Sequence, residues 1–217
     1  ICGYTQTDIE TTFAKHLEGQ DFKKIAKWYN GYKFLGEGVY NPFDILLFIE
    51  NQFAYRSYWF QTATPTFLLK LIEKNNYFLP NLENIVKDEM MLNSFDVDYI
   101  ELETLMWQTG YLTISESFEL FDEVRYRLSI PNQEVKTSLM GSISEYITKC
   151  NIVESKDKIK YILYKQELNK LETNLKSLYA SIPYNNFTNN NMYKYEGYYV
   201  SVFYSYMKAL GFDLVGE

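Results

Sequence analysis

The chain has 217 residues, of which 47% are hydrophobic and 23% are charged, a balance typical of a globular protein with a buried core. Its formal net charge of -7 argues against a protein that binds nucleic acid regardless of sequence, because such binding depends on Lys and Arg neutralising phosphates. The sequence has no apolar run of about eighteen residues and no basic leader. It therefore predicts neither a membrane span nor a signal peptide, and we expect a cytoplasmic protein.

Few residues suggest redox or metal chemistry. Cys2 and Cys150 have no cysteine or histidine close to them in sequence, so zinc is not expected, and two reduced thiols or a disulfide are the alternatives. The single histidine, His16, has no acid or nucleophile near it, which favours a surface position over a catalytic one. The chain starts at Ile1 rather than at a methionine, and we interpret it as a piece of a longer protein.

Helix start signals recur in the N-terminal part of the sequence. Asp21 is a good cap for a helix that we expect to stop at Gly31. A glycine-containing turn between aromatic residues then suggests a small β-hairpin over residues 32–40. Asn41 and the proline after it mark another helix start. Because this helix is apolar on nearly every side through Ile49, we expect it to be central in the fold.

The middle of the chain predicts a helix, a β-hairpin and a second helix. Gly110 lies where a left-handed residue would close the first helix. Segments 111–114 and 126–130 are rich in β-formers and pair naturally as a hairpin. Asn132 is a good cap for the second helix, and Glu134 in its first turn is favoured by the helix dipole. This order is that of a winged-helix-like unit.

The last third of the chain predicts helices with mixed charge. Lysines and carboxylates alternate around leucines after residue 151, which favours two solvated helices with pairs such as Glu172 and Lys176 over a nucleic-acid surface. A final helix over 192–210 is tyrosine-rich and apolar around most of its circumference. We expect such a helix to need neighbours on two sides and predict a homodimer through it. Its apolar stripe comprises Tyr195, Tyr199, Val202, Phe203, Tyr206 and Leu210.

Five motifs occur in order along the chain. They are Trp-Tyr-Asn-Gly-Tyr-Lys-Phe at 28–34, Val-Tyr-Asn-Pro-Phe at 39–43, Tyr-Trp-Phe-Gln-Thr-Ala-Thr-Pro at 58–65, Gln-Thr-Gly-Tyr-Leu-Thr-Ile at 108–114 and Pro-Asn-Gln-Glu-Val at 131–135. Together they resemble an uncharacterised bacterial family in which an AAA-ATPase-like domain precedes a PD-(D/E)XK nuclease-superfamily domain. Where that family usually has Gly in the third motif, this chain has Ala63.

The resemblance implies a division of the chain into two parts. Residues 1–150 would form the C-terminal lid and winged-helix-like part of the ATPase-like domain, and residues 151–217 the helical N-terminal part of the nuclease-like domain. Glu196 matches the first-helix glutamate that some superfamily members use near the metal, and a surface carboxylate favoured by the helix dipole is the alternative. The phosphate-binding loop and the remaining metal ligands would lie outside the chain. ATP and a divalent metal are thus implied for the parent protein, and neither for this part alone.

The expected fold is mainly α with a small β component, namely a helical lid, a winged-helix-like hairpin unit and helices leading into a truncated nuclease-like domain. We predict that large apolar side chains from these segments share a buried core. They are Trp28, Phe43, Leu46, Trp59, Leu105, Leu112, Leu128 and Leu139.

The expected function is that of a non-catalytic lid and connector. Its partner would be the rest of the parent chain, and nucleic acid would be bound through that parent. We expect no contact with a membrane. The alternative is a winged-helix module that binds DNA or protein. Arg125 and Arg127 favour DNA binding, but the hairpin carries more acids than bases, which disfavours contact with phosphates. These acids are Glu116, Glu119, Asp122 and Glu123.

Overall fold

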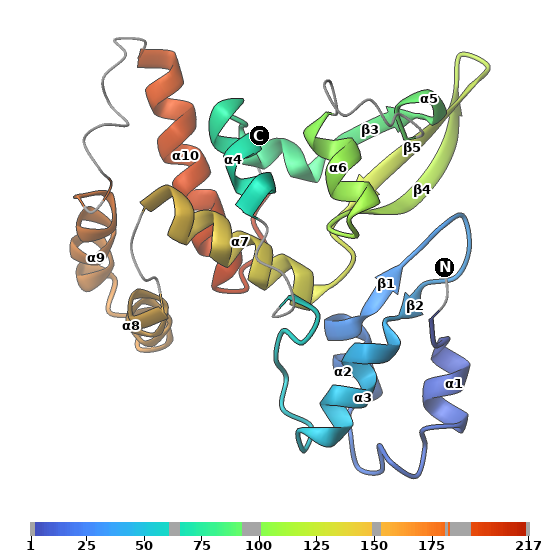
Figure 1. Cartoon of the computed structure of the whole chain (residues 1–217). Coiled ribbons are helices and arrows are strands. Elements are labelled where there is room, and N and C mark those ends of the chain that lie inside the picture. Colours follow the sequence, from blue (N-terminus) through green and yellow to red (C-terminus); the bar gives the residue numbers. More distant parts are fainter. Residues whose placement is uncertain are drawn as a thin grey trace. The chain divides into compact units, whose positions relative to one another are not determined.

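The computed structural model describes residues 3–60, 66–92, 101–148, 153–180, 182 and 192–215. Over these residues the chain is mainly helical, with two small antiparallel sheets, which confirms the predicted fold class at this level (Figure 1). The chain divides into two compact units. Unit 1 comprises Ile1–Leu68 and Leu82–Ser138, and unit 2 comprises Leu69–Asn81 and Leu139–Glu217. This division differs from the predicted boundary at 150, since an internal segment groups with the C-terminal helices.

The first part of unit 1 contains three helices and a two-stranded sheet. These elements are α1 (Gln6–Thr11), α2 (Phe22–Tyr29), β1 (Asn30–Tyr32), β2 (Val39–Tyr40) and α3 (Pro42–Glu50). Two predicted caps are confirmed, because Asp21 Oδ1 accepts a hydrogen bond from the Lys23 N–H at 2.9 Å and Asn41 Oδ1 accepts one from the Phe43 N–H at 3.0 Å. The strands β1 and β2 pair antiparallel, so the suggested hairpin is present.

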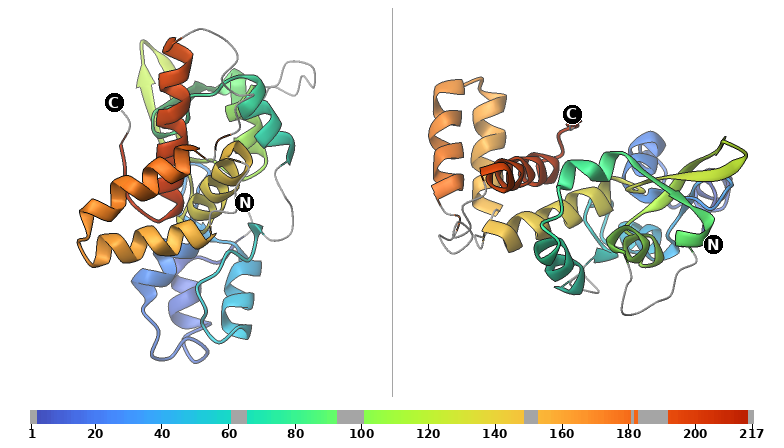
Figure 2. Two further views of the ribbon diagram at one scale, coloured as in Figure 1. Left: turned by 90° about the vertical axis from the view of Figure 1, so that its left-hand side faces the viewer. Right: turned by 90° about the horizontal axis from the view of Figure 1, so that it is seen from above.

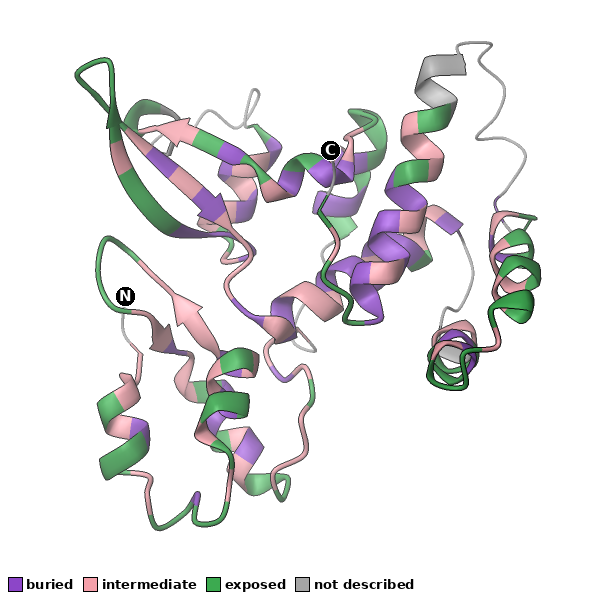
Figure 3. Cartoon of the chain, turned by 180° about the vertical axis from the view of Figure 1, so that it is seen from behind, coloured by how far each residue is buried: buried purple, intermediate pink, exposed green. Residues whose placement is uncertain are grey.

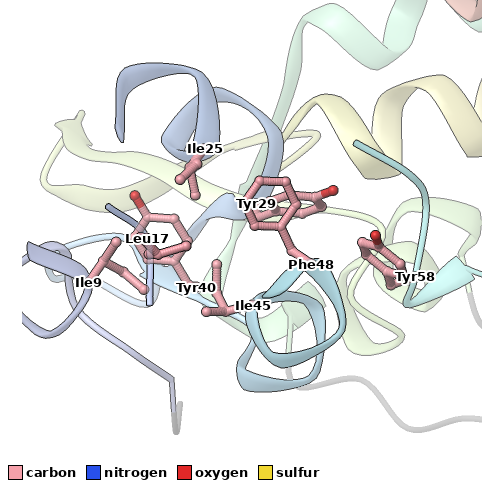
Figure 4. Packing of buried hydrophobic residues seen from close by; sticks show 8 residues of the cluster. All are labelled: Ile9, Leu17, Ile25, Tyr29, Tyr40, Ile45, Phe48 and Tyr58. Carbon is pink, nitrogen blue, oxygen red and sulfur yellow. The ribbon is translucent and has the colours of Figure 1, made fainter. Parts of the chain in front are cut away.

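Buried side chains from the three helices, from β2 and from the connecting segments form one cluster (Figure 4). Its members are Ile9, Leu17, Ile25, Tyr29, Tyr40, Ile45, Phe48 and Tyr58. Tyr29 lies in the middle of an aromatic group, with its ring centroid 5.5 Å from that of Phe48 and 6.1 Å from that of Tyr58. Its hydroxyl donates to the carbonyl of Arg56 at 3.1 Å, so a buried polar atom is satisfied.

The prediction that Phe43 and Leu46 of the apolar helix α3 belong to the buried core is wrong. Phe43 is 44% exposed and Leu46 is 50% exposed, whereas Asp44, Ile45 and Phe48 are completely buried. Helix α3 therefore buries one face only, and that face includes a carboxylate. The apolar composition of the helix gave no indication of which side the rest of unit 1 would cover.

Other predicted core residues have mixed outcomes. Leu112, Leu128 and Leu139 are at most 2% exposed, which confirms their assignment. The other three, Trp28, Trp59 and Leu105, are only half-buried. The two tryptophans are large side chains, which are seldom fully covered even within a core.

The second part of unit 1 is a three-stranded antiparallel sheet with two short helices. These elements are β3 (Ile85–Asp88), α5 (Glu89–Leu92), α6 (Leu102–Gln108), β4 (Thr113–Leu120) and β5 (Glu123–Ser129). A hairpin is formed as predicted by β4 and β5, but its strands extend through most of the residues between the predicted segments 111–114 and 126–130. Strand β3 pairs with the other side of β5. The hairpin closes on Phe121 and Asp122, which both have positive φ, as a type I′ turn requires.

Helix α6 ends as its sequence predicts. Gly110 has φ of +82°, and the Tyr111 N–H donates to the Met106 carbonyl at 2.8 Å. The Gly110 N–H donates to the Trp107 carbonyl at 3.1 Å. These two bonds make a Schellman cap, which turns the chain directly from α6 into β4.

Gly31 has a different role from the predicted one. Helix α2 already ends at Tyr29, and Gly31 lies within β1 with φ of +130°. A Cβ atom at this position would lie 1.9 Å from the carbonyl oxygen of Pro131. The glycine therefore allows β1 to pass directly against the segment that begins the next helix.

Helices dominate unit 2. Helix α7 (Gln133–Thr148) begins in unit 1 and ends in unit 2, and α8 (Val153–Tyr164), α9 (Leu168–Ala180) and α10 (Met192–Ala209) follow. Parts of α4 (Thr66–Lys74) and of the short helix η2 (Leu79–Glu83) complete the unit. Figure 2 shows α8 and α9 lying side by side as an antiparallel pair. None of the helices within the described ranges combines the length and the apolar character needed to cross a membrane.

Helix α10 is largely covered by its own chain (Figure 3). Val202 and Tyr206 are completely buried, and Leu210 is 7% exposed. The Leu79 N–H donates to Ser201 Oγ at 3.2 Å. The ring of Tyr199, a residue of α10, also packs against Tyr179 of α9.

The C-terminal part of the predicted stripe is therefore covered within the chain, whereas Tyr199 and Phe203 are half-buried and the side chain of Tyr195 lies outside the described residues. The homodimer stays a prediction, and the covered part of the stripe does not support it.

Candidate functional site

Glu196, the carboxylate that the sequence singles out, lies in the second turn of α10 and is exposed. Within the described parts of the chain, no group of three or more His, Cys, Asp or Glu side chains is placed to hold a metal ion. Among the described residues Glu196 thus belongs to no group of three such ligands, and its role beside a metal stays a prediction. His16 is exposed, as predicted.

The five sequence motifs, by contrast, meet in unit 1. Asn30 of the first motif pairs with Tyr40 of the second across the β1–β2 sheet. Lys33, also in the first motif, is fixed to the fourth by two hydrogen bonds: its N–H donates to Thr113 Oγ1 at 2.7 Å, and that hydroxyl donates back to the Lys33 carbonyl at 2.9 Å. The close approach of Gly31 to Pro131 joins the first motif to the fifth.

Trp59, from the third motif, contacts residues of the fourth and fifth motifs. Its ring centroid lies 5.3 Å from that of Tyr111 in an edge-on arrangement, and its ring edge lies 3.6 Å from where a Cβ atom at Gly110 would be. Its backbone N–H donates to Glu134 Oε1 at 2.8 Å. Segments far apart in the sequence thus form one motif junction, defined here by Gly31, Lys33, Tyr40, Trp59, Tyr111, Thr113, Pro131 and Glu134.

The N-terminal end of α7 is the central element of the motif junction. Asn132 Oδ1 accepts a hydrogen bond from the Val135 N–H at 3.0 Å, which confirms the predicted cap. Glu134 and Ser138 lie one turn apart, so they project from the same side of the helix. Ser138 is hydrogen-bonded to Ser57, two residues before Trp59. Helix α7 is therefore attached at two successive turns to the segment 57–59.

A pair of buried carboxyl groups lies at this junction. Asp44 of α3 and Glu134 of α7 are both completely buried and lie close enough for each to shift the pKa of the other, and both oxygens of Asp44 and Oε2 of Glu134 have no hydrogen-bond partner. Neither pairs with Lys, Arg or His among the described residues. Because two ionised carboxylates can only accept hydrogen bonds, a bond between them requires one proton. We therefore expect one proton on this pair, which would provide the hydrogen-bond donor that these oxygens lack.

The environment of the pair favours retention of that proton. Burial raises the pKa of Glu134, and the negative charge of Asp44 raises it further. Burial also raises the pKa of Asp44. The hydroxyl of Tyr32 is buried nearby, and burial followed by the charges of Asp44 and Glu134 raises the pKa of this phenol too. The surroundings thus disfavour a second negative charge.

The sequence does not reveal this pair. Glu134 is noticeable only as a first-turn acid, for which the helix dipole is sufficient explanation. Asp44 is the only charged residue among the apolar residues 42–49 of α3, and this interruption is the one signal that could have drawn attention to it. Both groups are closed to solvent, so they are unsuited to act on a substrate. What they can do is hold a proton and join α3 to α7.

The β4–β5 hairpin does not present free positive charge. Arg125 pairs with Glu123 on the same hairpin. The Nε of Arg127 lies 3.1 Å from Glu116 Oε2, and its guanidinium also lies over the ring of Phe118. Each arginine is therefore neutralised by a neighbouring carboxylate, and the hairpin offers little attraction to a phosphate backbone.

The chain is similar to a longer protein. It is 42% identical over 216 residues to "Uncharacterized protein in vnfD 5'region" of Azotobacter chroococcum mcd 1. The matched region covers 99% of this chain and 42% of that protein, so the chain spans about two-fifths of the length of this relative. No family model and no solved structure matches the chain.

Proposed function

We propose that this chain is the lid and connector part of a longer cytoplasmic protein that combines an AAA-ATPase-like domain with a PD-(D/E)XK nuclease-like domain. The observation that carries the proposal is the motif junction, in which all five motifs of the resemblance meet. The described residues of those motifs hold α7 and the two sheets of unit 1 together, chiefly through backbone pairing, packing and hydrogen bonds. This is the pattern expected of residues that maintain a structural connection rather than an active site.

The order of elements also supports the proposal. Helix α6, the β4–β5 hairpin and α7 follow one another as in a winged-helix-like lid, and the helices of unit 2 would lead into the nuclease-like domain. The greater length of the Azotobacter relative provides room for the phosphate-binding loop and for the missing metal carboxylates. Because both arginines of the hairpin are already paired, we prefer this function to a winged helix that binds DNA.

The proposal predicts that the chain is inactive by itself. We expect no ATP hydrolysis and no magnesium- or manganese-dependent cleavage of DNA, because a lone Glu196 is unable to hold the cation that polarises a phosphate. Phosphate release and plasmid nicking would be measured on the purified 217-residue chain, with Glu196→Ala as the control. Metal-dependent cleavage that disappears in Glu196→Ala would place an active site within this chain and contradict the proposal.

The longer relative provides a positive test. The full-length Azotobacter protein should bind MgATP, whereas its region of 216 matched residues should not. Calorimetric titration of both with a non-hydrolysable nucleotide would measure this difference. Equal binding by the two proteins, or no binding by the full-length one, would argue against an ATPase-like parent.

A further inference from the structure

Helix α8 exposes two aromatic rings close to each other. Tyr161 is 59% exposed and Tyr164 is 81% exposed, although both are large apolar rings. Residues three positions apart lie on the same side of a helix, so the rings are neighbours. Lys165 connects them, because its Nζ lies 5.8 Å from the centroid of Tyr161 and 5.7 Å from that of Tyr164. The result is an aromatic surface with an ammonium group at its centre.

Lysines are concentrated around these rings. Residues 155–170 contain five lysines and two carboxylates, within a chain whose formal net charge is -7. Of the carboxylates, Glu167 is paired with Lys170 at 2.6 Å. Lys158, Lys160 and Lys165 are exposed and form no ion pair with the other described side chains. A local positive surface therefore surrounds the two rings.

We propose that this surface of α8, made of Lys158, Lys160, Tyr161, Tyr164 and Lys165, binds single-stranded nucleic acid. Exposed aromatic rings stack on bases, whose flat faces are available only where the strand is not paired. Lysines beside the rings neutralise the phosphates that connect those bases. The surface lies in unit 2, away in sequence from the β4–β5 hairpin, and the inference does not depend on the ATPase- or nuclease-like assignment.

A solvated helix face explains only half of these observations. It accounts for the lysines, but it gives no reason to leave two adjacent rings in water with an ammonium group between them. A duplex would also leave the rings without a partner, because its bases are already stacked. The combination of aromatic faces with unpaired lysines favours a single strand over both alternatives.

Fluorescence anisotropy with a labelled oligothymidine of about 12 nucleotides tests the proposal on the whole 217-residue chain. The double variant Tyr161→Ala, Tyr164→Ala should bind at least about tenfold more weakly, since loss of one stacked base costs roughly 5- to 150-fold in affinity. Replacing Lys158, Lys160 and Lys165 with glutamine should reduce the slope of log affinity against log salt by about 2.

Matched variants separate stacking from general attraction to charge. Tyr161→Phe, Tyr164→Phe retains both rings and should bind like the wild type. Lys176→Gln removes an exposed lysine that is paired with Glu172 on α9, and it should have little effect. The alanine variant should bind heparin, which has no bases, as the wild type does. Loss of heparin binding in parallel with oligonucleotide binding would remove the case for stacking.

Two other results would overturn the proposal. The first is no binding of the oligonucleotide at low salt, which would make this face a site for protein contacts. The second is binding that survives all the α8 substitutions and is lost in Arg125→Gln, Arg127→Gln, which would assign it to the hairpin. Neither result bears on nucleotide binding by the longer relative, so the two proposals can fail independently.

Discussion

Replacing Leu112 with aspartate is expected to lower the free energy of unfolding of unit 1 by about 4 kcal/mol. Leu112 is only 2% exposed and lies between the end of α6 and the start of β4. The substitution removes an apolar contribution of roughly 1.5–3 kcal/mol and places a carboxylate where there is no solvent. A loss of this size is a large part of the total stability of an ordinary domain, roughly 5–15 kcal/mol.

Tryptophan fluorescence can follow this change in unit 1 alone. All three tryptophans of the chain, Trp28, Trp59 and Trp107, lie in that unit. Urea titrations monitored at these residues should show a lower midpoint for Leu112→Asp. The matched control is Leu120→Asp, because Leu120 lies on the same hairpin but is 44% exposed. If the two variants unfold at the same urea concentration, Leu112 does not contribute to the core as the structure indicates.

Local signals in the sequence predicted the helix caps and turns that depend on hydrogen bonds between residues close together in the chain. Asp21, Asn41 and Asn132 cap helices because each side chain reaches an N–H two or three residues away. Gly110 closes α6 for the same reason, since a left-handed residue and two short-range hydrogen bonds are all that the turn needs. The pairing of the β-forming segments 111–114 and 126–130 was also visible locally, although the two-residue turn at Phe121 and Asp122 was not. Such features require no knowledge of the rest of the fold.

Contacts between segments that are far apart in the sequence could not be predicted from these local signals. Gly31 resembles a helix stop, yet its role is set by a carbonyl oxygen that lies one hundred positions later, at Pro131. Helix α3 is apolar on nearly every side, and only its position within unit 1 decides that Asp44 faces inward while Phe43 faces solvent. For helix α10 the sequence indicated no second neighbour within the chain, because nothing in its own residues shows that Leu79 lies beside it. In each case the deciding group comes from elsewhere in the chain.

The motif junction and its buried carboxyl pair also arise from contacts between segments that are far apart in the sequence. The five motifs were visible as separate strings, but their convergence depends on pairings between β1 and β2 and between Lys33 and Thr113. Asp44 and Glu134 are ninety positions apart, and each has an ordinary local explanation by itself. Their proximity and complete burial turn two unremarkable acids into a pair that we expect to share a proton. That property is the basis for the second large effect expected here.

The stability of unit 1 should fall as the pH rises, and Glu134 should be the main cause. In the unfolded chain both carboxyl groups have ordinary pKa values near 4 and are ionised at neutral pH. In the folded unit, burial and then Asp44 raise the pKa of Glu134 to about 9. Between these values the folded state holds a proton that the unfolded state has released. The stabilisation is fully present below about pH 4 and declines by up to about 1.4 kcal/mol per pH unit as the pH approaches 9.

Glu134→Gln removes this titration and retains an oxygen that can accept the Trp59 N–H. The unfolding free energy of the variant, minus that of the wild type, should therefore increase by about 2 kcal/mol between about pH 6 and pH 8. Urea titrations followed by tryptophan fluorescence at several pH values would measure it. Glu119→Gln, an exposed change on the hairpin, should give a difference from wild type that does not vary with pH. Wild-type and Glu134→Gln curves that stay parallel across this range would show that Asp44 and Glu134 do not share a proton, and that α3 and α7 are joined at the motif junction by the Trp59 hydrogen bond and by packing alone.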